Sequence, residues 1–69
     1  MKVLLRNTES RRYYVGNGQW TPDSKQARDF DQIAQAIQFH QEERLTDMEV
    51  VLSYGAPYCD LVLPLRPEG

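Results

Sequence analysis

The two side chains best suited to covalent catalysis are Cys59 and His40, the only cysteine and the only histidine in the chain. A cysteine acts as a nucleophile when a base or a positive charge stabilises its thiolate. Asp60 follows Cys59 directly, and its negative charge disfavours the thiolate, while nothing in the sequence orients the imidazole toward the sulfur. We therefore expect Cys59 to be a small packed side chain, and we predict a non-enzymatic protein without catalytic residues.

The spacing of the other polar residues also disfavours metal binding and acid–base catalysis. His40 and Glu43 could share one side of a helix, but a metal site needs more ligands than this pair supplies. Asp29 and Asp31 are two positions apart, so on a helix they would not face each other, and helix capping explains them better. We expect no metal and no cofactor.

The most suggestive binding cluster is the run Arg11, Arg12, Tyr13 and Tyr14. Aromatic side chains beside arginines on a sheet can stack nucleic-acid bases and contact phosphates. A formal net charge of −2 opposes general attraction to nucleic acid or to anionic lipid. A nucleic-acid-binding module that uses this strand is therefore the alternative, disfavoured hypothesis.

The elements that would position these residues follow from turn signals and apolar periodicity. Runs rich in β-branched and apolar residues predict four strands, over residues 2–6, 11–15, 48–54 and 59–65. Gly16-Asn17-Gly18 should end the second strand, and no Gly-Lys-Ser/Thr step follows to make it a phosphate-binding loop. Because Pro64 lacks a backbone N–H, the last strand should lie at a sheet edge or fray there.

Residues 25–45 have a helical composition, with neither glycine nor proline. The apolar residues at helical spacing are Phe30, Ile33, Ala34 and Ile37. One long helix and a short turn followed by a helix both fit this segment. The order ββαββ predicts the α+β class, with a single helix on one face of an antiparallel sheet of three to four strands.

Length and composition indicate one domain over residues 1–69, with 66–69 as a flexible tail. Hydrophobic residues make up 41% and charged residues 26%, which is typical of globular proteins. A single cysteine cannot form an internal disulfide, and the apolar run Val3-Leu4-Leu5 is too short for a signal peptide. We expect a soluble, cytoplasmic protein that does not interact with membranes.

One helix can cover only one face of the sheet, because successive strand side chains alternate between faces. We expect the covered face to carry Val3, Leu5, Tyr13, Val15, Met48, Val50, Leu52, Cys59, Leu61 and Leu63. The predicted partner face on the opposite side consists of Leu4, Arg6, Arg12, Tyr14, Val51 and Val62. Phe39, on the flank of the helix, is a secondary candidate for contact with a protein partner.

The charge distribution favours self-association through that face. Residues 1–12 contain four basic residues and one acidic residue, whereas residues 23–49 contain three basic and seven acidic residues. A surface that carries both signs can pair with its own copy across a two-fold axis. The favoured hypothesis is an interaction or accessory domain that forms a homodimer, and an ordinary solvated face is the alternative.

Residues 13–37 contain a tyrosine strand, a Trp-Thr turn and an Ala-x-x-Phe step into a helix. The segments concerned are Tyr13-Tyr14-Val15, Gln19-Trp20-Thr21, Ala27-Arg28-Asp29-Phe30 and Ala36. This pattern resembles small uncharacterised bacterial proteins. The resemblance implies a bacterial source and a similar fold, and it implies no activity. In such a fold Trp20, Ala27 and Phe30 would close one end of the core.

Overall fold

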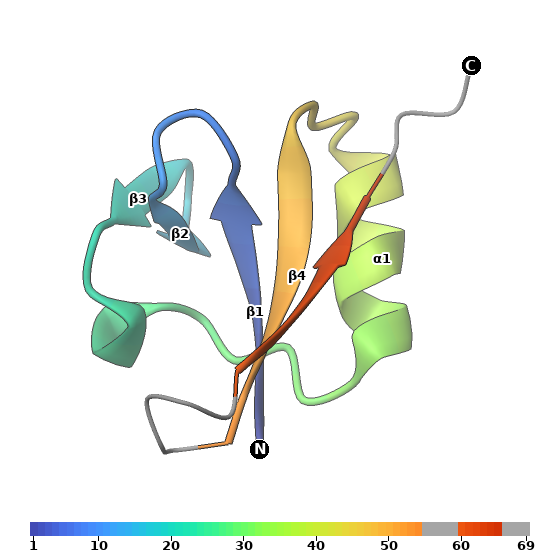
Figure 1. The fold of residues 1–69 in the computed structure, drawn as a ribbon. Coiled ribbons are helices and arrows are strands. Elements are labelled where there is room, and N and C mark those ends of the chain that lie inside the picture. Colours follow the sequence, from blue (N-terminus) through green and yellow to red (C-terminus); the bar gives the residue numbers. More distant parts are fainter. Residues whose placement is uncertain (55–59, 66–69) are drawn as a thin grey trace.

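The computed structural model describes residues 1–54 and 60–65, and within them five antiparallel strands form one sheet (Figure 1). The strands are β1 Lys2–Asn7, β2 Tyr13–Gly16, β3 Gln19–Thr21, β4 Met48–Ser53 and β5 Leu61–Pro64. Their spatial order is β3-β2-β1-β4-β5, which places β5 at an edge as the proline predicted. The α+β class is confirmed. The predicted strand count and the order ββαββ are wrong, because a further strand, β3, precedes the helix.

The additional strand follows Gly16-Asn17-Gly18, the turn predicted to end the second strand. Asn17 and Gly18 both have positive φ, 52° and 76°, so the chain reverses within two residues. Such a turn matches the twist of a β-hairpin. Gly16 then pairs with Gln19, and Tyr14 pairs with Trp20, so β3 extends the sheet beyond β2.

The segment expected to be helical consists of a short 3-10 turn, η1 Ser24–Gln26, and one α-helix, α1 Ile33–Glu42. The turn-plus-helix alternative is therefore the correct one. The Asp23 carboxylate caps η1 by accepting a hydrogen bond of 2.9 Å from the Lys25 amide.

Asp29 attaches the segment between η1 and α1 to the sheet. Its carboxylate accepts hydrogen bonds from the amides of Val3, at 3.0 Å, and Asp31, at 2.9 Å. These two bonds lower the pKa of Asp29 below its ordinary value of 3.8. The Asp29 carboxylate thus positions this segment of the chain. The predicted capping of the helix by Asp29 or Asp31 is wrong, because the N-cap of α1 is Gln32, which makes no side-chain capping hydrogen bond.

Helix α1 packs over the central strand β1 and its neighbour β4, and the core lies between the helix and these strands. The buried core residues are Val3, Leu5, Tyr14, Phe30, Ala36, Met48, Val50 and Leu52. Trp20 packs edge-on against Tyr14, with ring centroids 5.3 Å apart, and it is half-buried. Trp20 and Phe30 therefore contribute to the core from the β2–β3 side, as the sequence pattern suggested.

The two tyrosines of β2 occupy faces opposite to those predicted. Tyr14 is 8% exposed and belongs to the core beneath the helix. Tyr13 pairs with Arg6, and its hydroxyl accepts a hydrogen bond of 3.3 Å from that guanidinium on the other face. Which side chains of β2 face the helix depends on the loop that joins β2 to β1, where Arg11 has a φ of +62°. Alternation within β2 alone therefore could not assign the two tyrosines to their faces.

No helix in the described part of the chain is long and apolar enough to cross a membrane. Cys59 and the predicted tail, residues 66–69, lie outside the described residues.

Candidate functional site

The face of the sheet that points away from α1 is called the open face. The side chains at its centre are shielded from solvent. The strand registers place Leu4 opposite Val51 and Val51 opposite Val62, so these three side chains form a row. Leu4 and Val51 are each 1% exposed, whereas Val62 is 43% exposed. The predicted partner face is therefore corrected at two of its apolar residues, which a partner could not reach.

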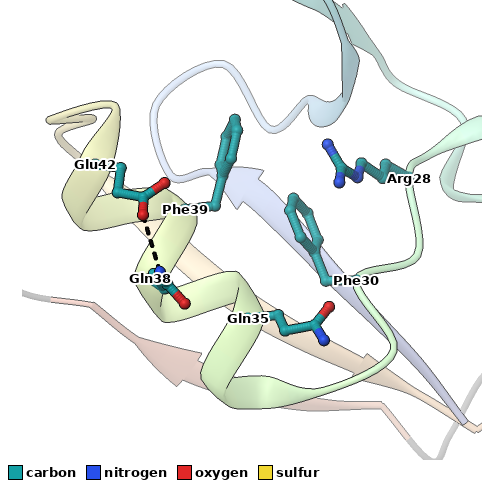
Figure 2. A pocket seen from close by; sticks show the side chains of 6 residues that line it. All are labelled: Arg28, Phe30, Gln35, Gln38, Phe39 and Glu42. Atoms are coloured by element: carbon teal, nitrogen blue, oxygen red, sulfur yellow. Dashed lines mark hydrogen bonds between the residues drawn. The ribbon is translucent and has the colours of Figure 1, made fainter.

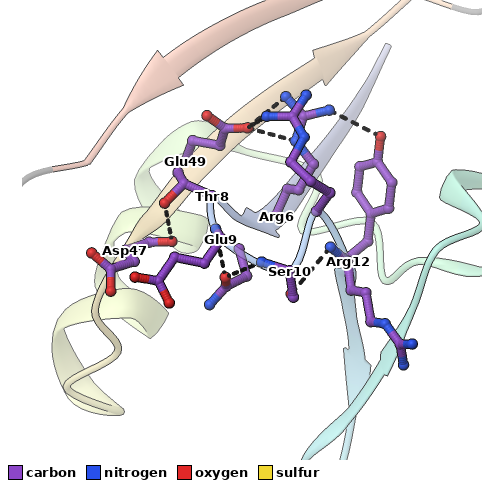
Figure 3. Close-up of polar contacts among 10 residues, drawn as sticks. Arg6, Thr8, Glu9, Ser10, Arg12, Asp47 and Glu49 are labelled. Carbon is purple, nitrogen blue, oxygen red and sulfur yellow. Dashed lines mark hydrogen bonds and ion pairs between the residues drawn. The ribbon is translucent and has the colours of Figure 1, made fainter.

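A charged network occupies the end of the open face near the β1–β2 loop (Figure 3). Arg6 forms a hydrogen-bonded ion pair with Glu49, and the two side chains are only 15% and 10% exposed. Arg11 approaches the same carboxylate at 3.7 Å but is 64% exposed. Because Glu49 is shared by two arginines, part of the basic charge of the first hairpin is neutralised within the domain.

The remaining predicted partner-face residues do not join this network as a continuous surface. Arg12 is exposed and lies in the loop before β2, where its amide donates a hydrogen bond of 3.3 Å to Ser10 Oγ. Tyr14 lies in the core, on the opposite side of the sheet. The face assignment of Tyr14 is therefore wrong, and Arg12 lies outside the strand predicted for it.

The positions of the residues from Arg11 to Tyr14 weaken the hypothesis that this run binds nucleic acid. A stacking platform needs exposed aromatic faces beside unpaired cations. Tyr14 is buried, and the Arg6 guanidinium lies over the Tyr13 ring at 5.6 Å from its centroid. Arg11 lies beside Glu49. The run from Arg11 to Tyr14 is therefore split between two faces of the sheet and a loop.

Phe39 is one of the residues that line a shallow, open pocket of about 250 Å³ beside the helix (Figure 2). It is half-buried and packs against Tyr14 and Phe30, with ring centroids 4.8 and 5.4 Å away. The Arg28 guanidinium covers Phe30 at 4.8 Å from its centroid. Phe39 is therefore half-buried in the aromatic cluster and also lines the pocket, and its role as a secondary contact for a protein partner stays a prediction.

His40 is 6% exposed, and its Nε2 is buried without a hydrogen-bond partner among the described residues. In the described ranges 1–54 and 60–65, no three residues of the types that hold metals are grouped together. The prediction that Cys59 is a packed side chain, and not a nucleophile activated by His40, concerns a residue outside those ranges.

Among the described strands, β5 carries the largest group of exposed apolar side chains. Leu61, Val62 and Leu63 are 55%, 43% and 39% exposed. The register of β5 against β4 places Leu61 and Leu63 on the helix side, with Val62 on the open face. The predicted side of the sheet is therefore correct for both leucines, but the expected coverage by the helix is wrong, because α1 lies over β1 and β4.

The backbone of β5 also has a free edge. Within residues 1–54 and 60–65, no strand pairs with the side of β5 that faces away from β4; this side is called the β5 edge. Leu65 donates its amide hydrogen to the Met48 carbonyl at 3.2 Å, so alternation directs the amides of Leu61 and Leu63 toward β4 as well. The N–H and C=O of Val62 therefore point outward along the β5 edge.

The chain matches no protein-family model, and comparison with curated proteins and with solved structures gives no match. The resemblance of residues 13–37 to small bacterial proteins therefore stays a prediction.

Proposed function

We propose that this chain is a non-enzymatic protein-interaction domain that binds its partner as an additional strand along the β5 edge. The observation that carries the proposal is the coincidence of an unpaired strand edge with three consecutive exposed apolar side chains, Leu61, Val62 and Leu63. Main-chain hydrogen bonds supply affinity in such strand addition, and alternate side chains supply specificity.

The composition of β5 supports a binding role over a solvated edge. Soluble proteins commonly protect edge strands with charged residues, bulges or prolines. β5 carries no charge between Leu61 and Pro64, and its one protective residue is Pro64 at the end. Apolar side chains on both faces of an edge strand are typical of a surface that becomes buried in a complex.

The proposal retains the interaction role predicted from the sequence and changes its location. Of the predicted apolar centre on the open face, only Val62 is accessible. We also propose that the domain acts in the bacterial cytoplasm, where a lone cysteine stays reduced.

The proposal is tested by titrating the isotope-labelled full chain with a generic strand peptide of alternating valine and threonine. We expect the largest amide shifts in the NMR spectrum at Val62 and Asp60, with slower hydrogen exchange at Val62. A peptide of the same composition with an N-methylated central residue is the control, because it lacks one edge hydrogen bond. Shifts centred on Phe39 and Gln38, or no binding at all, would contradict the proposal.

A further inference from the structure

We infer that the strand which occupies the β5 edge is β5 of a second copy, in an antiparallel pair whose two-fold axis passes beside Val62. This inference rests on the proposed function, and it adds the identity of the partner and the register of the pair. The structural basis is the outward-facing backbone of Val62, the residue order around it, and the position of Asp60.

The backbone at Val62 fits a two-fold pair. Because its N–H and C=O both point away from β4, two copies of Val62 placed opposite each other exchange two hydrogen bonds. Two positions away, the amide of Asp60 in one copy faces the carbonyl of Pro64 in the other. Pro64 has no N–H to return a second bond, so this regular pairing ends there.

The side chains of β5 are self-complementary around the same point. The sequence Leu61-Val62-Leu63 reads identically in both directions, so antiparallel pairing about Val62 places each leucine opposite a leucine and valine opposite valine. The two valines would meet on the open face, and the four leucines would meet on the helix side. An isologous interface requires this kind of self-complementary surface.

Charge favours this register over the one whose axis lies beside Leu61. With the axis beside Val62, the two Asp60 residues are offset by four positions, about 13 Å along the strands. With the axis beside Leu61, the offset falls to about 7 Å, inside the screening length of physiological salt. That register would also place Asp60 opposite Val62, so the pair about Val62 is favoured by both charge and apolar contact.

The interface of the proposed pair is small, even with helix α1 beside it. Phe39 lies on the flank of α1 that contacts Tyr14 in β2, so the opposite flank, which includes half-buried Ile37, faces the β5 side. In the pair, the two helices would lie on the same face of a continuous sheet with the leucines between them. Three exposed apolar residues per copy fall short of a standard interface of about 800 Å² per partner. The dimer should therefore be weak and concentration-dependent.

Sedimentation equilibrium of the full chain, from micromolar to about millimolar concentration, tests the inference. The wild-type average mass should rise from monomer toward dimer with concentration. Val62→Lys should weaken association about tenfold or more, because it removes an apolar contact and places two ammonium groups side by side. Gln26→Lys adds the same charge at an exposed site in η1 and should associate like the wild type.

Disulfide cross-linking tests the register without relying on the lysine variant. In a Cys59→Ser background, Val62→Cys should form a disulfide dimer rapidly under mild oxidation, since directly opposed residues in a hydrogen-bonded pair have Cα atoms about 5.5 Å apart. Gln26→Cys in the same background should cross-link only at the rate of random collision. Circular dichroism of each variant serves as the check that it is folded.

A wild-type chain that stays monomeric at millimolar concentration would overturn the inference, as would Val62→Cys cross-linking no faster than Gln26→Cys. If the monomer nonetheless binds the valine–threonine peptide at Val62, the proposed function stands and only the identity of the partner fails. If the peptide also fails to bind, the proposed function fails with it.

Discussion

Replacing Glu49 should destabilise the domain far more than replacing the exposed arginine beside it. The Glu49 side chain is 10% exposed and pairs with Arg6, which is 15% exposed. Removing one partner of a fully buried ion pair lowers the free energy of unfolding by about 3–5 kcal/mol. A fully exposed ion pair contributes only about 0–1 kcal/mol. The limited exposure of both side chains places Glu49→Leu nearer the buried limit, at about 2–3 kcal/mol.

Two further variants separate the loss of the ion pair from the cost of an unpaired charge. Arg11→Met removes a partner that is 64% exposed and 3.7 Å away, so it should cost less than about 0.5 kcal/mol. The double variant Arg6→Met with Glu49→Leu leaves no buried charge, so it should recover most of the stability lost in Glu49→Leu alone. The difference between the double variant and the two single variants measures the coupling energy.

Urea unfolding at neutral pH measures these differences, with the midpoint and slope fitted for each variant. A domain of this size has a total stability of only about 3–5 kcal/mol, so Glu49→Gln serves as a milder second variant if Glu49→Leu does not fold. The reasoning is refuted if Glu49→Leu costs no more than Arg11→Met, since the Arg6–Glu49 pair would then be solvated in solution.

Three other substitutions test different parts of the structure. His40→Leu should raise the unfolding free energy by about 1–3 kcal/mol, because it removes a buried nitrogen without a partner among the described residues; a lower urea midpoint would contradict this. Trp20→Ala should cost about 2–3 kcal/mol, below the 3–5 of a fully buried aromatic because Trp20 is half-buried, and an unchanged thermal midpoint would show that its contact with Tyr14 contributes little. The pKa of Asp29 is lowered in the folded state, chiefly by the Val3 amide, so the stabilisation is present above the unfolded value of 3.8 and is lost as the pH falls through the folded value. Asp29→Asn should flatten the acid limb of stability against pH, and an unchanged limb would show that these bonds do not form in solution.

The class of the fold could be predicted because its main signals are local. Apolar β-branched runs identified most of β1 and all of β4 and β5, and Pro64 indicated an edge position that the structure confirms. The missing strand also had a local signal. Asn17-Gly18 is a typical two-residue hairpin turn, but it was interpreted as the end of a strand.

The faces of the outer strands could not be predicted from alternation alone. The parity of Tyr13 and Tyr14 is set by the loop from β1, so a shift of one residue exchanges their faces. The exposure of Leu61 and Leu63 depends on the width of the helix. An α-helix is about 10 Å across and strands lie about 4.8 Å apart, so one helix covers about two strands of a five-stranded sheet.

The position of β1 between β2 and β4 has a consequence for how the chain reaches its native state. Lys2 pairs with Ser53, so the middle of the sheet closes only when segments from distant parts of the sequence meet. The β2–β3 hairpin joins neighbouring residues, so its loop closes at a small cost in entropy. Pairing of β1 with β4 closes a much longer loop, which contains all the residues between the two strands. Such non-local pairing slows folding relative to helical proteins of similar length. The rate-limiting step should therefore be the meeting of β1 with β4, and the hairpin should form before it.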